Sequence, residues 1–267
     1  NFNWPRLRHD LKKVFVSVLL CAAAVPAAHG KPKSDTKQLL ERARQKYYNL
    51  RRSGLIEFQA DIKPNWKLVF TGIEPNPTAM KVFEGLHFSV ALDSGSKLRV
   101  NHYADVAPSD PQSAERNERI FTDMDQAVSR FLATWSMFML TSPFPEVNNG
   151  YKEVADGYHF LHKEPGIDVL TVTDKDFMII EIKVSGAGFT SSLRPVLEKT
   201  TMGFILRGYD ATHEKLSSTR NTLLEVRLDY QQVKGLQLPR KVNVNTVYDG
   251  KPAQLEYRFV DYQVTVR

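Results

Sequence analysis

The last third of the chain alternates apolar and polar residues, and this two-residue period constrains the fold more than any other feature. Apolar residues occupy every second position from Leu224 to Tyr230, and the same period returns from Val242 to Tyr248. A strand with one buried and one solvated face has this pattern. Between the two runs, Lys234 and Gly235 suit a tight turn, because glycine readily adopts a positive φ. We therefore predict an antiparallel β-hairpin.

A third strand follows this hairpin and carries an irregularity. Apolar side chains share one face from Leu255 to Phe259, and beyond Asp261 the parity shifts to Tyr262. Such a shift predicts a β-bulge, which bends its strand and so favours a curved sheet. Pro239 has no N–H to donate to a ladder and predicts an irregular start to the second strand of the hairpin.

The rest of the chain predicts two helices among further strands. An amphipathic helix is expected from a capping pair at Asp35 and Gln38 to about Leu50, closed by Gly54. A longer helix is expected from Asp110-Pro111 to about Leu140. Alternation predicts strands at 56–62, 66–70, 86–92, 98–102, 158–160, 167–172, 177–184 and 204–206, and residues 185–200 are expected to form a polar loop.

These elements show neither a repeat nor a β-α-β rhythm, and they predict an α+β fold. We expect a strongly curved antiparallel sheet, in effect an unclosed β-barrel, with helices covering its concave face. Residues 31–267 are expected to form a single domain, because a chain with 42% hydrophobic and 25% charged residues is long enough to bury one large core.

Residues 1–30 are typical of a secretory signal peptide. A basic segment from Arg6 to Lys13 precedes an apolar run from Val14 to Val25, and small residues follow, with cleavage expected after Ala27 or Gly30. The apolar run is short for a membrane span, which needs about 20 residues. We therefore predict export, with the periplasm as the destination.

Cysteine and charge usage agree with this destination. Cys21 is the only cysteine, and Leu20 stands before it where a lipidation signal normally requires a small residue, so acylation is not expected. Removing residues 1–30 would leave no cysteine, which fits a periplasmic domain better than a disulfide-rich extracellular module. The same segment holds +3 of the net charge of +6, so no nucleic-acid partner is predicted.

No catalytic motif is recognisable in the sequence, and we predict a protein that is not an enzyme and uses no cofactor or metal. His159 and His162 would point to opposite faces of a strand, and His213 is followed by Glu214 in an expected polar connector. Asp174 and Asp176 suit a tight turn without any further role.

The long helix carries the strongest functional signal, because large apolar side chains recur along it at steps of three and four. Methionine adapts its shape to varied apolar partners. We predict that this stripe and the facing strand line an apolar ligand cavity, with the helix as a lid; the residues are Met124, Val128, Phe131, Trp135, Phe138, Met139, Phe88 and Val90. The alternative is a helix that only fills the core, and one helix can do both.

The order of elements, with Gly235-Leu236-Gln237-Leu238-Pro239 and Tyr257-Arg258-Phe259-Val260-Asp261-Tyr262 in the closing hairpins, resembles the periplasmic lipoprotein carrier and outer-membrane lipoprotein-sorting proteins, the LolA/LolB-like family. The resemblance implies an unclosed β-barrel, capped by helices, whose apolar cavity holds the acyl chains of lipoproteins or lipids. It also implies transport between membranes without nucleotide or metal. No individual donor or acceptor residue of the family is carried over to this chain.

Two further functions are weighed against the carrier. A non-catalytic interaction or stress-sensing protein of the envelope, with the same fold, would bind a protein partner through a sheet edge or through residues 185–200. An outer-membrane barrel is disfavoured, because the solvated strand faces carry charged residues such as Glu225, Arg227 and Asp229.

Overall fold

The computed structural model describes residues 34–69, 77–145, 150–215, 221–248 and 250–267. The predicted signal peptide, its two cleavage positions and Cys21 lie outside the described residues. The chain divides into two compact units. Unit 1 comprises the described residues within 1–48, 137–226 and 245–252, and unit 2 comprises those within 49–136, 227–244 and 253–267. The prediction of a single domain stays a prediction, and strands β10, β11 and β12 contribute residues to both units.

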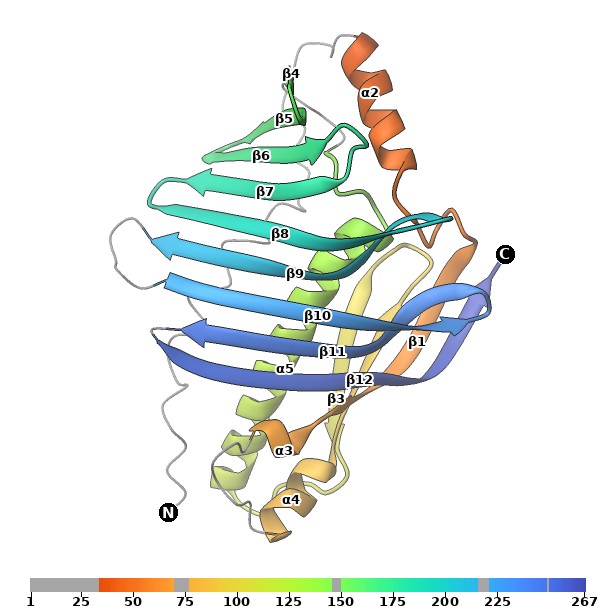
Figure 1. Ribbon diagram of the computed structural model, residues 1–267. Helices are drawn as coiled ribbons and strands as arrows, with labels where there is room; N and C mark the ends of the chain where they lie inside the picture. The colour runs from red at the N-terminus through yellow and green to blue at the C-terminus, as the bar shows by residue number, and fades with distance from the viewer. Residues whose placement is uncertain (1–33, 70–76, 146–149, 216–220, 249) are drawn as a thin grey trace. The chain divides into compact units, whose positions relative to one another are not determined.

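Four helices and twelve strands occur in the described residues (Figure 1). The helices are α2 (Ser34–Gln45), α3 (Trp66–Val69), α4 (Pro77–Glu84) and α5 (Pro111–Met139). The strands are β1 (Leu55–Pro64), β2 (Leu86–Leu92), β3 (Leu98–Ala104), β4 (Gly150–Val154), β5 (Gly157–Glu164), β6 (Ile167–Asp174), β7 (Ile179–Gly186), β8 (Phe189–Thr200), β9 (Gly203–Lys215), β10 (Asn221–Val233), β11 (Leu236–Tyr248) and β12 (Lys251–Val266).

All twelve strands belong to one unclosed sheet in the order β3-β2-β1-β12-β11-β10-β9-β8-β7-β6-β5-β4. β1 pairs antiparallel with β12, which joins the first hairpins of the chain to the last strand. The predicted large antiparallel sheet with few helices is confirmed. β3 and β4 are the two ends of the strand order, so each has a strand partner on one side in the described sheet.

The C-terminal strands form as their sequence predicts. Lys234 and Gly235 have φ values of 49° and 81°, and this pair of positive angles makes the turn between β10 and β11. Asp261 has a φ of 54°, and the register of β1 against β12 shifts there, from Gln59 opposite Gln263 to Asp61 opposite Val260. The β-bulge predicted from the change of parity is therefore confirmed.

Three local predictions are wrong. Residues 185–200 do not form a loop: β7 extends to Gly186, and β8 occupies 189–200 and pairs with β9, with Ser191 and Leu193 buried on one face of the strand. Residues 66–69 form α3 instead of a strand; the backbone N–H of Asn65 donates to the carbonyl of Glu256, and the next turn then begins. The first helix ends at Gln45 instead of near Leu50, because the backbone from 46 to 48 hydrogen-bonds to Phe204.

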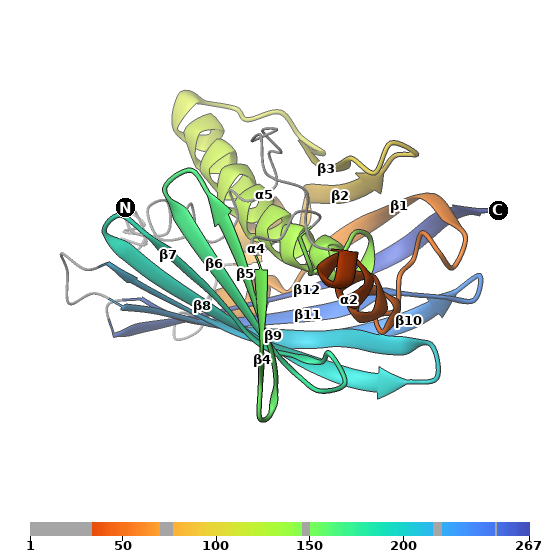
Figure 2. The same ribbon diagram turned by 90° about the horizontal axis from the view of Figure 1, so that it is seen from above.

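The core of unit 2 lies where α5 packs on β1, β2 and β12 (Figure 2). The ring of Trp135 meets Phe58 of β1 at 6.3 Å between centroids. Phe131 meets Tyr257 at 6.1 Å and Phe259 at 6.0 Å, both on β12. Packing of one helical stripe against one sheet face is the expected way to bury both.

The core of unit 1 is organised around Tyr47, just after α2. Its ring packs on Phe138, Phe144 and Phe204, with centroids 5.4 to 6.3 Å apart. Its hydroxyl donates to the carbonyl oxygen of Phe177 at 3.0 Å and accepts the backbone N–H of Ile179 at 2.8 Å. This one side chain therefore holds the start of β7.

Candidate functional site

The candidate site is the apolar face of α5, whose position follows from its sequence. Asp110 caps the helix, since its Oδ1 accepts the backbone N–H of Ser113 at 2.8 Å, and Pro111 is the first helical residue as predicted. These hydrogen bonds lower the pKa of the Asp110 carboxyl. From Ile120 onwards most of the large apolar residues fall on one side of the helix and are buried, while Glu115 and Arg119 on the first turns are exposed.

All eight residues predicted for the site are buried, and six of them come together in unit 2. Met124, Val128, Phe131 and Trp135 belong to the part of α5 in unit 2, and Phe88 and Val90 belong to β2 in the same unit. The last two, Phe138 and Met139, belong to unit 1, where Phe138 packs on Tyr47. The role of these residues in ligand binding stays a prediction.

Two buried polar atoms interrupt this apolar face. Trp135 has an exposed fraction of 0%, and its indole Nε1 has no hydrogen-bond partner within the described residues. Asn117, near the start of α5, is also buried, and its Oδ1 has no such partner there. Leaving a buried donor or acceptor unpaired costs roughly 1–3 kcal/mol. Polar groups without partners therefore occur in the layer where the sequence predicts a ligand.

A polar contact between α5 and β3 was not predicted from the sequence. Nδ1 of His102 on β3 lies 2.7 Å from Oδ2 of Asp125, and the imidazole stacks on Phe121 with 4.2 Å between ring centroids. Burial raises the pKa of the Asp125 carboxyl, and the nearby His102 opposes this shift. The signal in the sequence was the four-residue step from Phe121 to Asp125, which places both side chains on the same side of a helix.

Two other polar residues singled out in the sequence, Asp174 and His162, contact residues that are close to them in the chain. Asp174 accepts the backbone N–H groups of Asp176 and Met178, so it shapes the turn before β7. His162 on β5 contacts Glu164 at 3.0 Å. Within the described ranges, no three His, Cys, Asp or Glu side chains are grouped so that they could hold a metal ion.

His213 does not lie in a polar connector, as the sequence suggested, but within β9. It is buried there, its Nδ1 is 2.7 Å from the hydroxyl of Ser191 on β8, and the ring packs against Phe189. The neutral imidazole can accept a hydrogen bond from the Ser191 hydroxyl at Nδ1. Burial lowers the pKa of His213, and the charge of Lys215 lowers it further.

The lowered pKa of His213 predicts a pH-dependent stability. Below the ordinary histidine pKa of 6.5, the unfolded chain binds a proton that the folded protein still excludes. The free energy of unfolding should therefore fall as the pH drops below 6.5, until the folded-state pKa is reached. Urea unfolding between neutral and mildly acidic pH measures this slope. A His213→Gln variant should flatten it and a His159→Gln control should keep it; an unchanged slope in His213→Gln would contradict the assignment.

A comparison of the chain with models of known protein families, with curated proteins and with solved structures gives no match. The resemblance to the LolA/LolB-like family therefore stays a prediction. Among the helices of the described residues, none is both long enough and apolar enough to cross a membrane.

Proposed function

We propose that the protein is a periplasmic binding or carrier protein for acylated molecules, which holds the acyl chain of a lipoprotein or lipid between the sheet and α5. The observation that carries the proposal is the long apolar face of α5, packed on the aromatic face of β1, β2 and β12. Nε1 of Trp135 lies inside this face and has no hydrogen-bond partner in the described part of the chain. Most binding sites for small molecules are apolar, with few polar groups that fix orientation.

We take the sheet as strongly curved, an unclosed β-barrel with helices on its concave side. The bulge at Asp261 and the register shift between Leu55 and Glu57 support curvature, because bulges bend a strand and increase its twist. α5 then acts as both core and lid, so an acyl chain enters where the helix separates from the strands.

The free energy gained by burying an acyl chain is similar in size to the free energy lost by uncovering the apolar face of α5. Each methylene removed from water contributes about 0.8 kcal/mol, so about 14 methylenes contribute on the order of 11 kcal/mol. Uncovering four large side chains of the α5 face costs roughly 1.5–3 kcal/mol each, or about 6–12 kcal/mol together. A ligand that replaces the helical side chains can therefore be taken up and released without nucleotide hydrolysis.

The contact of α5 with the edge strand suits such an exchange. His102 and Asp125 keep about a third of their side-chain surface exposed, at 33% and 27%. A pair that is this accessible to water contributes little to stability, typically 0–1 kcal/mol. Separation of α5 from β3 would break this contact at small cost. The free energy of separating the helix from the strands would therefore depend mainly on the apolar layer.

Three sequence features support a location in the envelope. Residues 1–30 have the order of a signal peptide, the closing hairpins resemble those of the LolA/LolB-like family, and no catalytic motif is recognisable in the sequence. We therefore propose the periplasm as the location and lipid or lipoprotein acyl chains as the partners, with no enzymatic step.

Native mass spectrometry of the protein purified from a periplasmic extract tests the proposal. We expect adducts with masses of phospholipid or acylated peptide, confirmed by organic extraction, and saturable binding of a fluorescent fatty acid. A Val128→Asn variant places an amide in the layer and should weaken fatty-acid binding, whereas Ser129→Asn, at the next and exposed position of the same helix, is the matched control. Ligand-free protein that also fails to bind the fluorescent fatty acid would overturn the proposal.

The second candidate is a non-catalytic interaction or stress-sensing protein of the envelope, and the ends of the strand order favour it. β3 ends the order in unit 2, and Tyr103 on this strand is 62% exposed. An edge strand with unpaired backbone groups can accept a strand from another protein. Lipid-free protein whose Tyr103 position cross-links to an envelope protein would favour this candidate over the carrier.

A further inference from the structure

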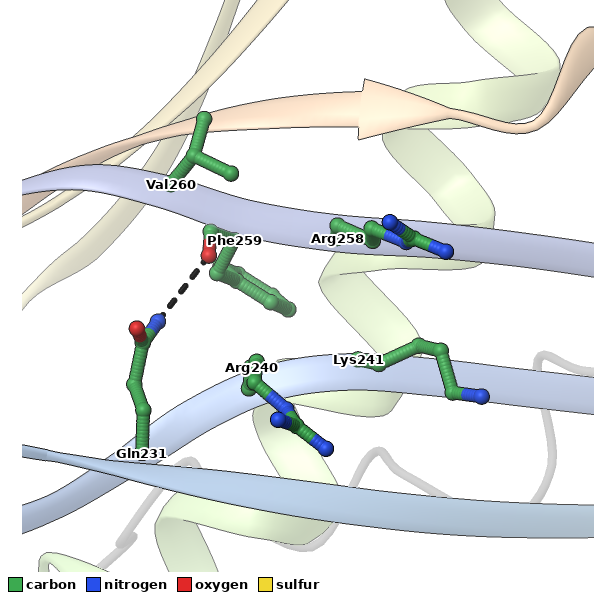
Figure 3. Close-up of a pocket in the computed structure, with 6 residues that line it drawn as sticks. All are labelled: Gln231, Arg240, Lys241, Arg258, Phe259 and Val260. Atoms are coloured by element: carbon green, nitrogen blue, oxygen red, sulfur yellow. Dashed lines mark hydrogen bonds between the residues drawn. The ribbon is translucent and has the colours of Figure 1, made fainter.

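A pocket of about 430 Å³ lies on β10, β11 and β12 within unit 2 (Figure 3). Its lining residues are Gln231, Arg240, Lys241, Arg258, Phe259 and Val260. Tyr257 and Phe259 send their rings to Phe131 of α5, so alternation along β12 places Arg258 and Val260 on the opposite face of the strand. The pocket therefore opens on the side of the sheet away from α5.

An irregular region of the sheet builds the pocket. Pro239 has no backbone N–H, and its carbonyl oxygen accepts hydrogen bonds from the Gln231 side-chain amide at 3.2 Å and from the Tyr262 hydroxyl at 2.8 Å. The same Gln231 Nε2 also donates to the carbonyl of Phe259 on β12 at 3.0 Å. One side chain of β10 therefore bridges β11 and β12 next to the bulge at Asp261. Figure 3 shows its hydrogen bond to Phe259.

Three cationic side chains line this pocket, and none of its six lining residues in the described chain is a carboxylate. Arg240 and Lys241 each lie 3.7 Å from Asp229, and Arg258 lies 3.8 Å from Glu256. These separations are longer than hydrogen bonds, so the carboxylates offset charge without occupying the N–H donors at close range. The side chains of Arg240 and Arg258 are 61% and 64% exposed, so both guanidinium groups can be reached from solvent.

The neighbouring strand adds a further cation. Lys63 on β1 is the register partner of Arg258 on β12, and it is exposed. Like charges that lie directly opposite each other on a sheet destabilise the pairing. Asp61, which lies opposite Val260, is the third carboxylate on this face. Lys63 therefore adds positive charge beside the three cations that line the pocket, and an anion bound next to Arg258 would reduce the repulsion among them.

We propose that this pocket binds a phosphate-type oxyanion, carried by a lipid headgroup or free in solution. The planar guanidinium groups of Arg240 and Arg258 match the paired oxygens of a phosphate, and Lys241 adds a third donor group. Figure 3 shows these three side chains extending in the same direction along β11 and β12. Because the pocket lies on the face of β12 away from α5, this site is independent of the acyl-chain site.

Calorimetry with inorganic phosphate at constant ionic strength, and co-sedimentation with phosphatidylglycerol or phosphatidylcholine vesicles, test the site. In an Arg240→Gln/Arg258→Gln variant we expect binding to weaken by about tenfold or more, because two charge-assisted contacts are lost. An Arg194→Gln/Lys199→Gln variant removes the same charge from exposed positions of β8 and should bind like the unchanged protein.

The two ligand arms identify the source of the phosphate. Binding to phosphatidylglycerol vesicles that the pocket variant loses would support a lipid headgroup. Saturable binding of inorganic phosphate alone, lost in the same variant, would support a soluble ligand. The proposal is overturned if the protein binds neither ligand, or if the β8 control variant loses as much binding as the pocket variant.

Discussion

Replacing Trp135 with alanine is expected to lower the free energy of unfolding by about 3–5 kcal/mol, the usual range for a buried tryptophan. The side chain is fully buried, and its ring packs against Phe58 across the layer between α5 and β1. Truncation removes this contact area and leaves a cavity that the sheet cannot fill by collapse. Urea unfolding followed by circular dichroism measures the change as a lower midpoint with the same dependence on denaturant.

A Trp135→Phe variant is the matched control. It keeps an aromatic ring in the layer and removes the indole N–H that has no partner within the described residues. Its loss of stability should therefore be much smaller than that of Trp135→Ala, about 1 kcal/mol or less, because the lost volume is offset by removal of an unpaired donor. A Trp135→Ala variant as stable as the unchanged protein would show that α5 does not pack on the sheet as described.

The second large effect is expected for Tyr47→Phe, which removes one oxygen atom from unit 1. The hydroxyl serves two backbone groups at once, the carbonyl of Phe177 and the N–H of Ile179. Burial raises the pKa of this hydroxyl, so it stays protonated and can donate. Without it, two buried backbone groups lose a partner at roughly 1–3 kcal/mol each, so we expect a loss of about 2–4 kcal/mol.

The backbone conformation of Phe177 makes the protein sensitive to loss of the Tyr47 hydroxyl. Its φ of 68° lies in the left-handed region, which is unfavourable for a bulky residue and persists only where the surroundings hold it. Tyr47 supplies the hydrogen bond, and the ring of Tyr158 stacks on Phe177 at 5.0 Å. Thermal unfolding measures the effect, with Tyr103→Phe at an exposed position as the control. Equal melting temperatures for the two variants would contradict the role assigned to Tyr47.

Periodicity and turn chemistry were sufficient to predict the regular parts of the fold. The turn at Lys234-Gly235, the bulge at Asp261 and the start of α5 at Pro111 each have a local cause in the residues themselves. The burial of the α5 stripe also follows from its spacing, because residues three and four apart share one side of a helix.

Features set by distant partners were not predictable in the same way. The polar segment at 189–200 becomes β8 because β9 pairs with it. β1 pairs with β12 only as far as Pro64, followed by the hydrogen bond from Asn65 to Glu256 far along the chain, and 66–69 then forms α3. The contact of His102 with Asp125 and the pocket at Arg240 and Arg258 each depend on strand order, which the two-residue period does not specify.

The most direct test of the acyl-chain proposal is to tether α5 to β3 and measure ligand uptake. His102 and Asp125 already meet at 2.7 Å, so cysteines at these positions, with Cys21 replaced by serine, can be joined by a short reducible cross-linker. We expect the tethered protein to take up little fluorescent fatty acid, and reduction of the cross-link to restore saturable binding. Equal uptake by the tethered and the reduced protein would show that the fatty acid does not enter beneath α5.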